Sequence, residues 1–332
     1  MKNKQVIIGI DVSKASLDVF IHGCKGYFVV DNGPAGFSTL LETVIKRTGC
    51  RKDELFFCFE NTGKYSRMLS VFLHTQSIPF VMESALSIKR SLGLTRGKSD
   101  KVDAQRIALY AYEKRERLSP TVLPGAEIDQ LKALLSLREK LVRHRTAYKN
   151  GLTDLHDCYK EGENSTIIGV QQRLICSVNQ EIAEVERGIQ AIIQGDESLL
   201  KNFELVLSVK GVGKILAFYL LAYTANFTLF GSARAFACYA GIAPFEYSSG
   251  TVKGAPRVHP LANKHLKSLL NLAAMSAIQQ KGEYQLYYHK RINELGKNKM
   301  STLNVIRNKL VYRVFAVVNR GTPYVDLLKF AA

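Results

Sequence analysis

The chain has 332 residues, of which 46% are hydrophobic and 23% charged, and its formal net charge is +17. This length suits two or three domains with sizeable cores, and the composition is that of an ordinary soluble globular protein. No apolar stretch reaches the ~20 residues of a membrane helix, and no signal-peptide pattern follows Met1, so we expect a cytoplasmic protein. The scattered cysteines predict neither a zinc site nor a disulfide framework.

The first ~115 residues alternate strand and helix patterns. Strands are predicted over Val6–Asp11, Leu17–His22, Tyr27–Val30, Leu55–Glu60 and Phe80–Met82, and helices over Pro34–Arg47 and Gly63–His74. Three early antiparallel strands followed by alternating strands and helices predict an α/β ribonuclease-H-like domain over residues 1–118. In such a sheet, acidic side chains project from the ends of the central strands.

Four acidic residues lie where that fold would use them. Asp11 and Glu60 each end an apolar run, while Asp100 and Asp103 share one side of a helix predicted to begin near Val102. Together they predict a cage for hard divalent cations, with two Mg²⁺ ions ~3.5–4 Å apart. Each acid also has an ordinary alternative, because Asp11 and Asp100 could cap a turn or a helix and Glu60 could be an edge residue.

A break at Ser119–Gly125, with two prolines and a glycine, separates this region from a long helical pattern. One helix is predicted from Glu127 to about Tyr159, a turn at Glu161–Ser165, and a return helix over Ile167–Gly195. Leucines at spacings of three, four and seven predict a coiled-coil helical hairpin over residues 126–197. The sequence leaves open whether its partner is its own return helix or another subunit.

Residues 198–332 are predicted to form a mainly α-helical C-terminal domain. It begins with a helix-hairpin-helix-like element around Gly211 and Gly213, where backbone N–H groups, Lys210 and Lys214 could meet a phosphate. The alternative is that the two glycines only connect packed helices. Later helices are predicted over Ile215–Thr224, Leu266–Gln279 and Thr302–Asn319.

Positive charge is concentrated near the C-terminal end: the segment from Thr251 to Ala332 contains 14 Lys and Arg residues and only three acidic residues. A metal-binding acidic centre in so basic a chain predicts an enzyme acting on nucleic acid phosphodiesters. The segment Ala240–Thr251 is predicted to be a loop or hairpin. Four basic residues near it could hold a phosphate beside one hydroxyl: Lys253, Arg257, His259 and Lys264. A serine nucleophile such as Ser249 would need activation by a base or a metal.

Several strings of residues resemble the DEDD transposases of bacterial insertion sequences. The N-terminal ones are Ile8-Gly-Ile-Asp11-Val-Ser-Lys14, Glu60-Asn-Thr-Gly-Lys-Tyr65 and Gly97-Lys-Ser-Asp100-Lys-Val-Asp103-Ala104. Ser208-Val-Lys-Gly211-Val-Gly213, Tyr239-Ala-Gly241-Ile-Ala-Pro244 and Ser249-Gly250 resemble that family's C-terminal domain. The resemblance covers nearly the whole chain, and pilin-gene DNA invertases are similar to the same family. Asn61 and Ser99 depart from the usual pattern without removing a charge.

The resemblance implies a Holliday-junction-resolvase-like N-terminal domain in which Asp11, Glu60, Asp100 and Asp103 hold Mg²⁺. It implies that Ser249 attacks DNA and forms a covalent phosphoserine intermediate, although Ser248 leaves the identity of the nucleophile open. Family members act as dimers or tetramers on donor and target DNA. Some are directed by a structured RNA encoded by the element.

We therefore expect a DNA transposase or recombinase. Two alternatives keep an enzymatic role: a site-specific DNA invertase of the same family, and a metal-dependent junction nuclease without a covalent step. A third is a nucleic-acid-binding regulator that retains an inactive nuclease fold.

Overall fold

A computed structural model describes residues 6–24, 26–91, 99–158, 165–249, 252–258 and 262–326. The chain forms two compact units, residues 1–123 and 124–332, which we take in turn. Within the described ranges, every helix is too short or too polar to span a bilayer.

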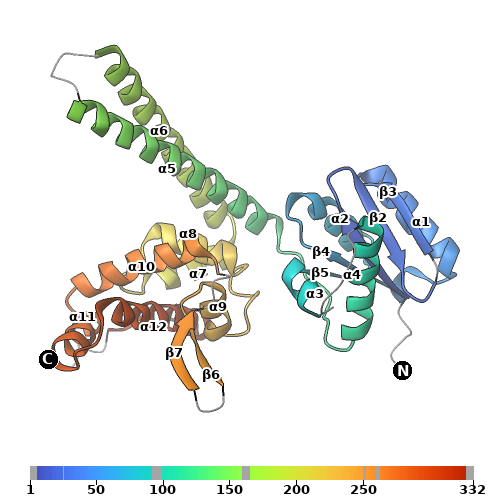
Figure 1. Cartoon of the computed structure of the whole chain (residues 1–332). Helices are drawn as coiled ribbons and strands as arrows, with labels where there is room; N and C mark the ends of the chain where they lie inside the picture. Colours follow the sequence, from blue (N-terminus) through green and yellow to red (C-terminus); the bar gives the residue numbers. More distant parts are fainter. Residues whose placement is uncertain are drawn as a thin grey trace. The chain divides into compact units, whose positions relative to one another are not determined.

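The first unit contains one mixed sheet with the strand order β3-β2-β1-β4-β5 (Figure 1). The strands are β1 (Val6–Val12), β2 (Ser16–Ile21), β3 (Gly26–Asp31), β4 (Leu55–Glu60) and β5 (Phe80–Glu83). β2 is antiparallel to both β1 and β3, whereas β4 is parallel to both β1 and β5. The predicted mixture of strands and helices is confirmed, and every predicted strand begins and ends within one residue of an observed one.

Helices cover both faces of this sheet because its central strands are apolar on both sides. Ile10, Phe57 and their neighbours form a core beneath α1 (Pro34–Thr48) and α2 (Lys64–Thr75). Ile7 and Cys58 point to the other face and pack with α4 (Asp100–Lys114), beside the short α3 (Ala85–Ser91). Since side chains alternate along a strand, every second residue of β1 faces α4.

Gly9 brings α4 close to β1. A Cβ atom built on Gly9 would lie 2.3 Å from the Ala108 nitrogen and 2.5 Å from the Ala104 oxygen. Only a residue without a side chain permits this approach. The helix therefore lies directly on the strand that carries Asp11, with the first turn of the helix near that residue.

The second unit begins with two long antiparallel helices, α5 (Ala126–Cys158) and α6 (Ser165–Gln194) (Figure 1). Arg138 pairs with Glu186 at 2.7 Å, and Arg145 donates to Asn179 at 3.1 Å. As residue numbers rise along α5 they fall along α6, so the helices run in opposite directions. Residues 159–164, which include most of the predicted turn, lie outside the described residues.

The base of this hairpin belongs to the core of the C-terminal helices. Leu131 and Leu135 of α5 and Ile189 and Ile193 of α6 join the same buried cluster as residues after 197. The hairpin is therefore part of the second compact unit, where the sequence predicted three segments over 1–118, 126–197 and 198–332. A coiled-coil packing of the two helices remains a prediction.

In the described part of the second unit, the remaining regular elements are helices and one β-hairpin, as predicted. Its elements are α7 (Glu197–Leu207), α8 (Lys214–Tyr223), α9 (Ala233–Tyr239), β6 (Pro244–Ser249), β7 (Val252–Val258), α10 (Lys264–Gln279), α11 (Glu283–His289), a π-helical turn (Lys290–Glu294) and α12 (Lys299–Arg320). Seven successive residues of α8, Leu216 to Ala222, are buried, so this apolar helix is surrounded by its neighbours.

The turn that leads into β6 is held by α12. Asn304 and Asn308 both donate side-chain hydrogen bonds of 2.8 Å to the backbone oxygen of Ile242. Gly241 has a φ of 66°, and a Cβ there would lie 2.4 Å from that of Ala262. The Tyr239–Pro244 motif thus fixes where the β6–β7 hairpin leaves the helical core.

Candidate active site

Three strand-borne carboxylates meet at one edge of the first unit's sheet. Asp11 lies opposite Asp18 in the antiparallel pair of β1 with β2. In the parallel pair of β1 with β4, Ile10 lies opposite Phe59, so Glu60 follows beside Asp11. The parity of each strand places all three side chains on the face that α4 covers.

The first turn of α4 brings the other two predicted acids to this edge. Ser99 caps the helix, since its hydroxyl accepts a hydrogen bond of 3.3 Å from the Val102 nitrogen. Asp100 is therefore not the N-cap that the alternative interpretation required. The Asp103 carboxylate forms a 2.8 Å ion pair with the guanidinium of Arg106, which lies one turn further along the helix. The positive end of the helix dipole favours both carboxylates.

Asp11 is the electrostatic centre of the group. Partial burial, together with the negative charges of Asp103, Asp100, Asp18 and Glu60, raises the pKa of its carboxyl from 3.8 to about 6. Asp11 is therefore within the electrostatic field of all three other predicted acids, which come from two separate stretches of sequence. Perturbed carboxylates of this kind concentrate at catalytic and metal-binding sites.

The carboxylates are near one another but are not arranged as a ligand shell. Among the described residues, no three His, Cys, Asp or Glu side chains are close enough together to hold one ion. Like charges repel one another, and Asp103 is paired with Arg106. The donors are all hard oxygens around an Asp11 with a raised pKa, so the residue set fits a divalent cation such as Mg²⁺.

Two further acids at this face escaped the sequence reasoning. Asp18 is only 6% exposed and lies opposite Asp11, and Glu83 ends β5 opposite Glu60. A carboxylate inside the apolar strand Ser16–Ile21 was a usable signal for Asp18. Glu83 ends its strand as Glu60 does, but Phe80–Met82 was too short a run to draw attention to the residue after it.

A partly buried hydrogen bond helps to accommodate the Asp18 carboxylate. The Tyr27 hydroxyl on β3 donates to the Asp18 carboxylate at 2.5 Å, and this bond, with burial, raises the pKa of Tyr27 to about 12. The ammonium group of Lys101 lies 5.3 Å from the centre of the Tyr27 ring. A chain of contacts therefore runs from the acidic edge to a cation on α4.

The proposed serine lies at the end of the first strand of the C-terminal hairpin. The backbone of Ser249 pairs with Val252, and that of Ser248 pairs with Lys253. The side chains of Ser248, Ser249 and Lys253 lie outside the described residues, as do Gly250 and Thr251. The sequence interpretation of a hairpin at Ala240–Thr251 is confirmed, whereas the role of either hydroxyl stays a prediction.

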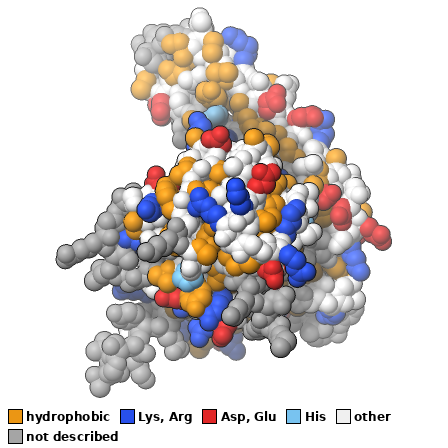
Figure 2. Space-filling view, turned by 90° about the vertical axis from the view of Figure 1, so that its right-hand side faces the viewer, with side chains coloured by type: hydrophobic (Ala, Val, Ile, Leu, Met, Phe, Trp, Pro, Cys, Tyr) orange, Lys and Arg blue, Asp and Glu red, His pale blue; other side chains and the backbone are white. Residues whose placement is uncertain are grey.

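The bases proposed to contact nucleic acid have different surroundings. Lys210 forms an ion pair with the buried Asp326 and also donates to the Lys281 backbone oxygen at 3.2 Å. Lys214, Arg257 and Lys264 are exposed. Figure 2 shows Lys and Arg side chains scattered between hydrophobic and polar ones on one face of the molecule, and it identifies none of these bases. Contact of these bases with a phosphate remains a prediction.

Comparisons with known proteins place both halves of the chain in one group. Residues 8–159 match a family model described as a transposase, of the DEDD type. Residues 203–289 match the model of the transposase IS116/IS110/IS902 family. The first match contains all four predicted acids, and the second contains the proposed serine and the glycine turn at Gly211.

Similar proteins include a pilin gene-inverting protein and transposases. A pilin gene-inverting protein of Moraxella bovis is 26% identical over 330 residues, which span 96% of this chain and 97% of that protein. The transposase for insertion sequence element IS1111A of Coxiella burnetii is 24% identical over 258 residues, 68% of each chain. A probable family 20 transposase of Pseudomonas aeruginosa is 24% identical over 55% of this chain and 60% of its own length.

Proposed function

This chain belongs to the IS110-type transposase family, and from that premise we propose that it cuts and exchanges DNA strands by metal-assisted serine chemistry. The observation that carries the proposal is the grouping of Glu60, Asp100 and Asp103 around the carboxyl of Asp11, whose pKa is raised. Family membership implies a DNA recombinase, and the acids supply the chemistry that such an enzyme needs.

We infer that the four acids hold two Mg²⁺ ions in a ribonuclease-H-like domain. The order of the sheet and the acids at its edge support this assignment. When bound, such ions polarise a phosphodiester and stabilise the entering and leaving oxygens. Asp11 lies on the central strand and Asp100 and Asp103 on α4, so closing the centre requires that α4 stay on β1.

The proposed nucleophile is Ser249. Its hydroxyl oxygen forms a bond to phosphorus as the bond from phosphorus to a deoxyribose oxygen breaks, and that oxygen leaves with a proton. The covalent phosphoserine keeps the energy of the phosphodiester, so a second deoxyribose hydroxyl can attack it and release the serine. Donor and target strands are exchanged in this way without an external energy source.

Two variants test the catalytic proposal on linear DNA carrying the native flanks of the gene. Asp11→Asn should abolish Mg²⁺-dependent cleavage, and Ser249→Ala should abolish detergent-resistant protein–DNA adducts. Asp31→Asn, at the exposed end of β3, is the matched control. Wild-type cleavage by Asp11→Asn would refute the metal centre. Adducts in Ser249→Ala would move the role to Ser248, and cleavage without adducts in the wild type would indicate a junction nuclease.

We further propose that the protein works as a dimer or tetramer with a structured RNA encoded beside its gene. The long exposed hairpin of α5 and α6 supports assembly, because Ile167, Val170 and Leu174 leave apolar surface open on it. Expression with native flanks, followed by sequencing of RNA that co-purifies, tests the RNA. Recovery of only random cellular RNA would contradict it.

A second candidate is a site-specific invertase. The match to the pilin gene-inverting proteins spans almost the full length of both chains, further than the match to the IS1111A transposase. An invertase and a transposase of this family would share the chemistry and differ in the DNA joined. A reporter with the flanks in inverted orientation distinguishes them, since inversion without excision would favour the invertase.

A further inference from the structure

We propose that a groove between α4 and the β2–β3 hairpin binds unpaired DNA nucleotides next to the strand that is cut. This inference rests on the proposed function, because it assigns to the acidic centre a neighbouring site for its substrate. The groove is lined on one side by Lys101 and Gln105 of α4, next to Asp100 and Asp103, and the same side of the helix runs on toward Arg115. Nothing in the catalytic proposal uses it.

The floor of the groove is made of aromatic rings. α4 packs on β1 and β2 and leaves the same face of the edge strand β3 uncovered. Phe20 and Tyr27 lie opposite each other in the β2–β3 register, so their side chains share that face. Together with Gly23 and Cys24 they line a cavity of about 480 Å³ whose other wall is α4.

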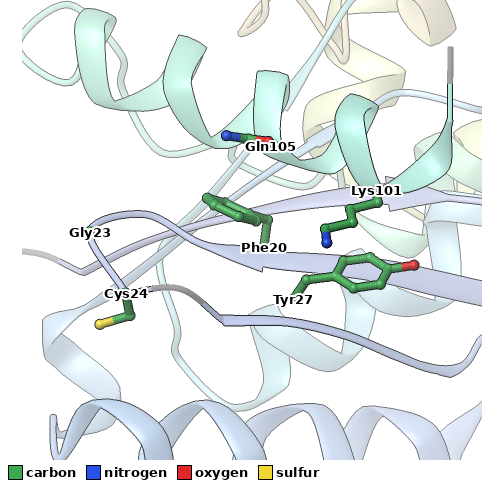
Figure 3. A pocket seen from close by; sticks show the side chains of 6 residues that line it. All are labelled: Phe20, Gly23, Cys24, Tyr27, Lys101 and Gln105. Carbon is green, nitrogen blue, oxygen red and sulfur yellow. The ribbon is translucent and has the colours of Figure 1, made fainter. Parts of the chain in front are cut away.

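The helical wall supplies polar groups at regular intervals. Figure 3 shows Gln105 above Phe20 and Lys101 above the Tyr27 ring. Lys101 and Gln105 are four residues apart, so they share one side of α4, and both are exposed. The Gln105 amide above Phe20 could form hydrogen bonds with the edge of a base stacked on that ring. The Lys101 ammonium above Tyr27 could bind a phosphate.

The same side of α4 continues into a second aromatic and cationic stack. The rings of Tyr112 and His22 are stacked with their centres 4.1 Å apart and their planes at 25°. The Arg115 guanidinium lies 4.4 Å from the centre of the Tyr112 ring, and residue Tyr112 is 41% exposed. From Lys101 to Arg115 this side of the helix measures about 21 Å, the length of a few nucleotides.

The chemistry of the groove selects single strands over duplexes. Bases in a duplex already stack on one another, whereas unpaired bases offer free faces to aromatic side chains. The cations Lys101 and Arg115 at its two ends attract the phosphates. The nearby Asp18 carboxylate is buried and accepts a hydrogen bond from Tyr27, so it is not part of the surface that a strand would touch.

The occupant we propose is DNA. The groove opens at the acidic centre, so the nucleotides that reach it are those joined to the phosphodiester held there. Strand exchange separates bases next to the cut, which provides unpaired nucleotides at this position.

Fluorescence anisotropy of the full-length protein in EDTA tests the groove without cleavage. The probes are a blunt DNA duplex and the same duplex with a five-nucleotide DNA tail. We expect the wild type to bind the tailed probe roughly 10-fold more tightly. Phe20→Leu and the more exposed Tyr112→Leu should each remove most of that gain and leave blunt-duplex affinity unchanged.

Phe28→Leu is the matched control. Phe28 neighbours Tyr27 on the opposite face of β3, with the Arg47 guanidinium 4.7 Å from its ring centre. The Phe28→Leu variant should keep the full gain in affinity for the tailed probe over the blunt duplex. Equal affinity of the wild type for both probes, or an equal loss of gain in all three variants, would overturn the proposal. A gain seen with an RNA tail but not with a DNA tail would assign the groove to RNA and overturn it as well.

The two proposals can fail separately. Binding in EDTA depends on no metal and no serine, so an inactive Asp11→Asn protein that retains the gain leaves the groove intact. Conversely, active protein without the gain removes the groove and leaves the catalytic proposal standing.

Discussion

Asp11 shows how a single residue can weaken the fold that carries it. Its carboxyl is partly buried and surrounded by other acids, so ionisation costs more in the folded protein than in the unfolded chain. The folded pKa of about 6 exceeds the ordinary 3.8, so the folded state binds the proton more tightly. Stability is therefore lost as the pH rises from about 4 to about 6, and the loss persists above that range.

We predict that Asp11→Asn makes the metal-free protein more stable at pH 8 by about 1–2 kcal/mol, after allowance for the partial exposure of the group. At pH 4 the wild-type carboxyl is largely protonated, and the two proteins should have nearly the same melting temperature. Thermal unfolding in EDTA at the two pH values measures this. Added Mg²⁺ should stabilise the wild type more than the variant. A variant less stable at pH 8 would contradict the prediction.

Lys210 and Lys214 carry the same charge but should behave differently. Lys210 is paired with Asp326, which is 7% exposed, whereas Lys214 is exposed in the first turn of α8. We predict that Lys210→Ala lowers the free energy of unfolding by about 2 kcal/mol, because it leaves a buried carboxylate without this partner. Lys214→Ala should leave stability unchanged and weaken DNA binding. Chemical denaturation measures the stability of both variants, and fluorescence anisotropy measures their DNA binding. A stable Lys210→Ala variant, or a Lys214→Ala variant that is destabilised, would contradict the prediction.

At the scale of elements, the contact of α4 with β1 decides whether the site exists. Asp11 and Glu60 come from the strands β1 and β4, whereas Asp100 and Asp103 come from α4, later in the chain. Only close packing of α4 on the sheet brings the four acids together. Gly9 makes that packing possible because Ala104 and Ala108 occupy the space of its missing side chain. The helix register then places Asp100 and Asp103 near Asp11.

We predict that Gly9→Ala displaces α4, destabilises the first unit by about 1–3 kcal/mol and reduces cleavage by more than its effect on folding explains. Gly33→Ala is the control, since a Cβ there meets no atom within 4 Å and its φ of −164° is extended backbone. Melting temperature and cleavage rate of both variants provide the measurement. If Gly9→Ala and Gly33→Ala both had the melting temperature and cleavage rate of the wild type, the prediction would be contradicted, because α4 could then shift without consequence.

At the scale of the whole molecule, a net charge of +17 sets the strength of the general attraction to DNA. Neutralising phosphates releases counterions, so affinity for duplex DNA should fall steeply with salt. The proposed gain from aromatic stacking in the groove should depend on salt much less, because it is not an exchange of ions.

We predict at least a 100-fold loss of blunt-duplex affinity between 50 and 200 mM salt, with a smaller relative change in the gain from a single-stranded tail. Anisotropy titrations of both probes at four salt concentrations check this. A shallow slope for the blunt duplex would mean that few of the basic residues reach the phosphates.

Local pattern accounts for much of what the sequence predicted correctly. Alternation and apolar runs located the five strands, and Pro34 marked where α1 begins, whereas the Ser99 cap of α4 was found only in the structure. The long stripes of α5 and α6 located both helices of the hairpin. The short helices α3 and α9 were missed, because seven residues contain too little periodicity to be recognised.

The sequence by itself determined the element types, the basic charge and, through the resemblance, the acids and serine that we propose for catalysis. Only the tertiary structure decided which carboxylates share one field, that Asp18 and Glu83 lie beside them, that Lys210 is paired with Asp326 and that α4 leaves a groove over β3. The physical reason is distance along the chain. Periodicity and capping act over a few residues, whereas these contacts join residues from seven to more than a hundred positions apart, and strand register and helix packing bring those residues together.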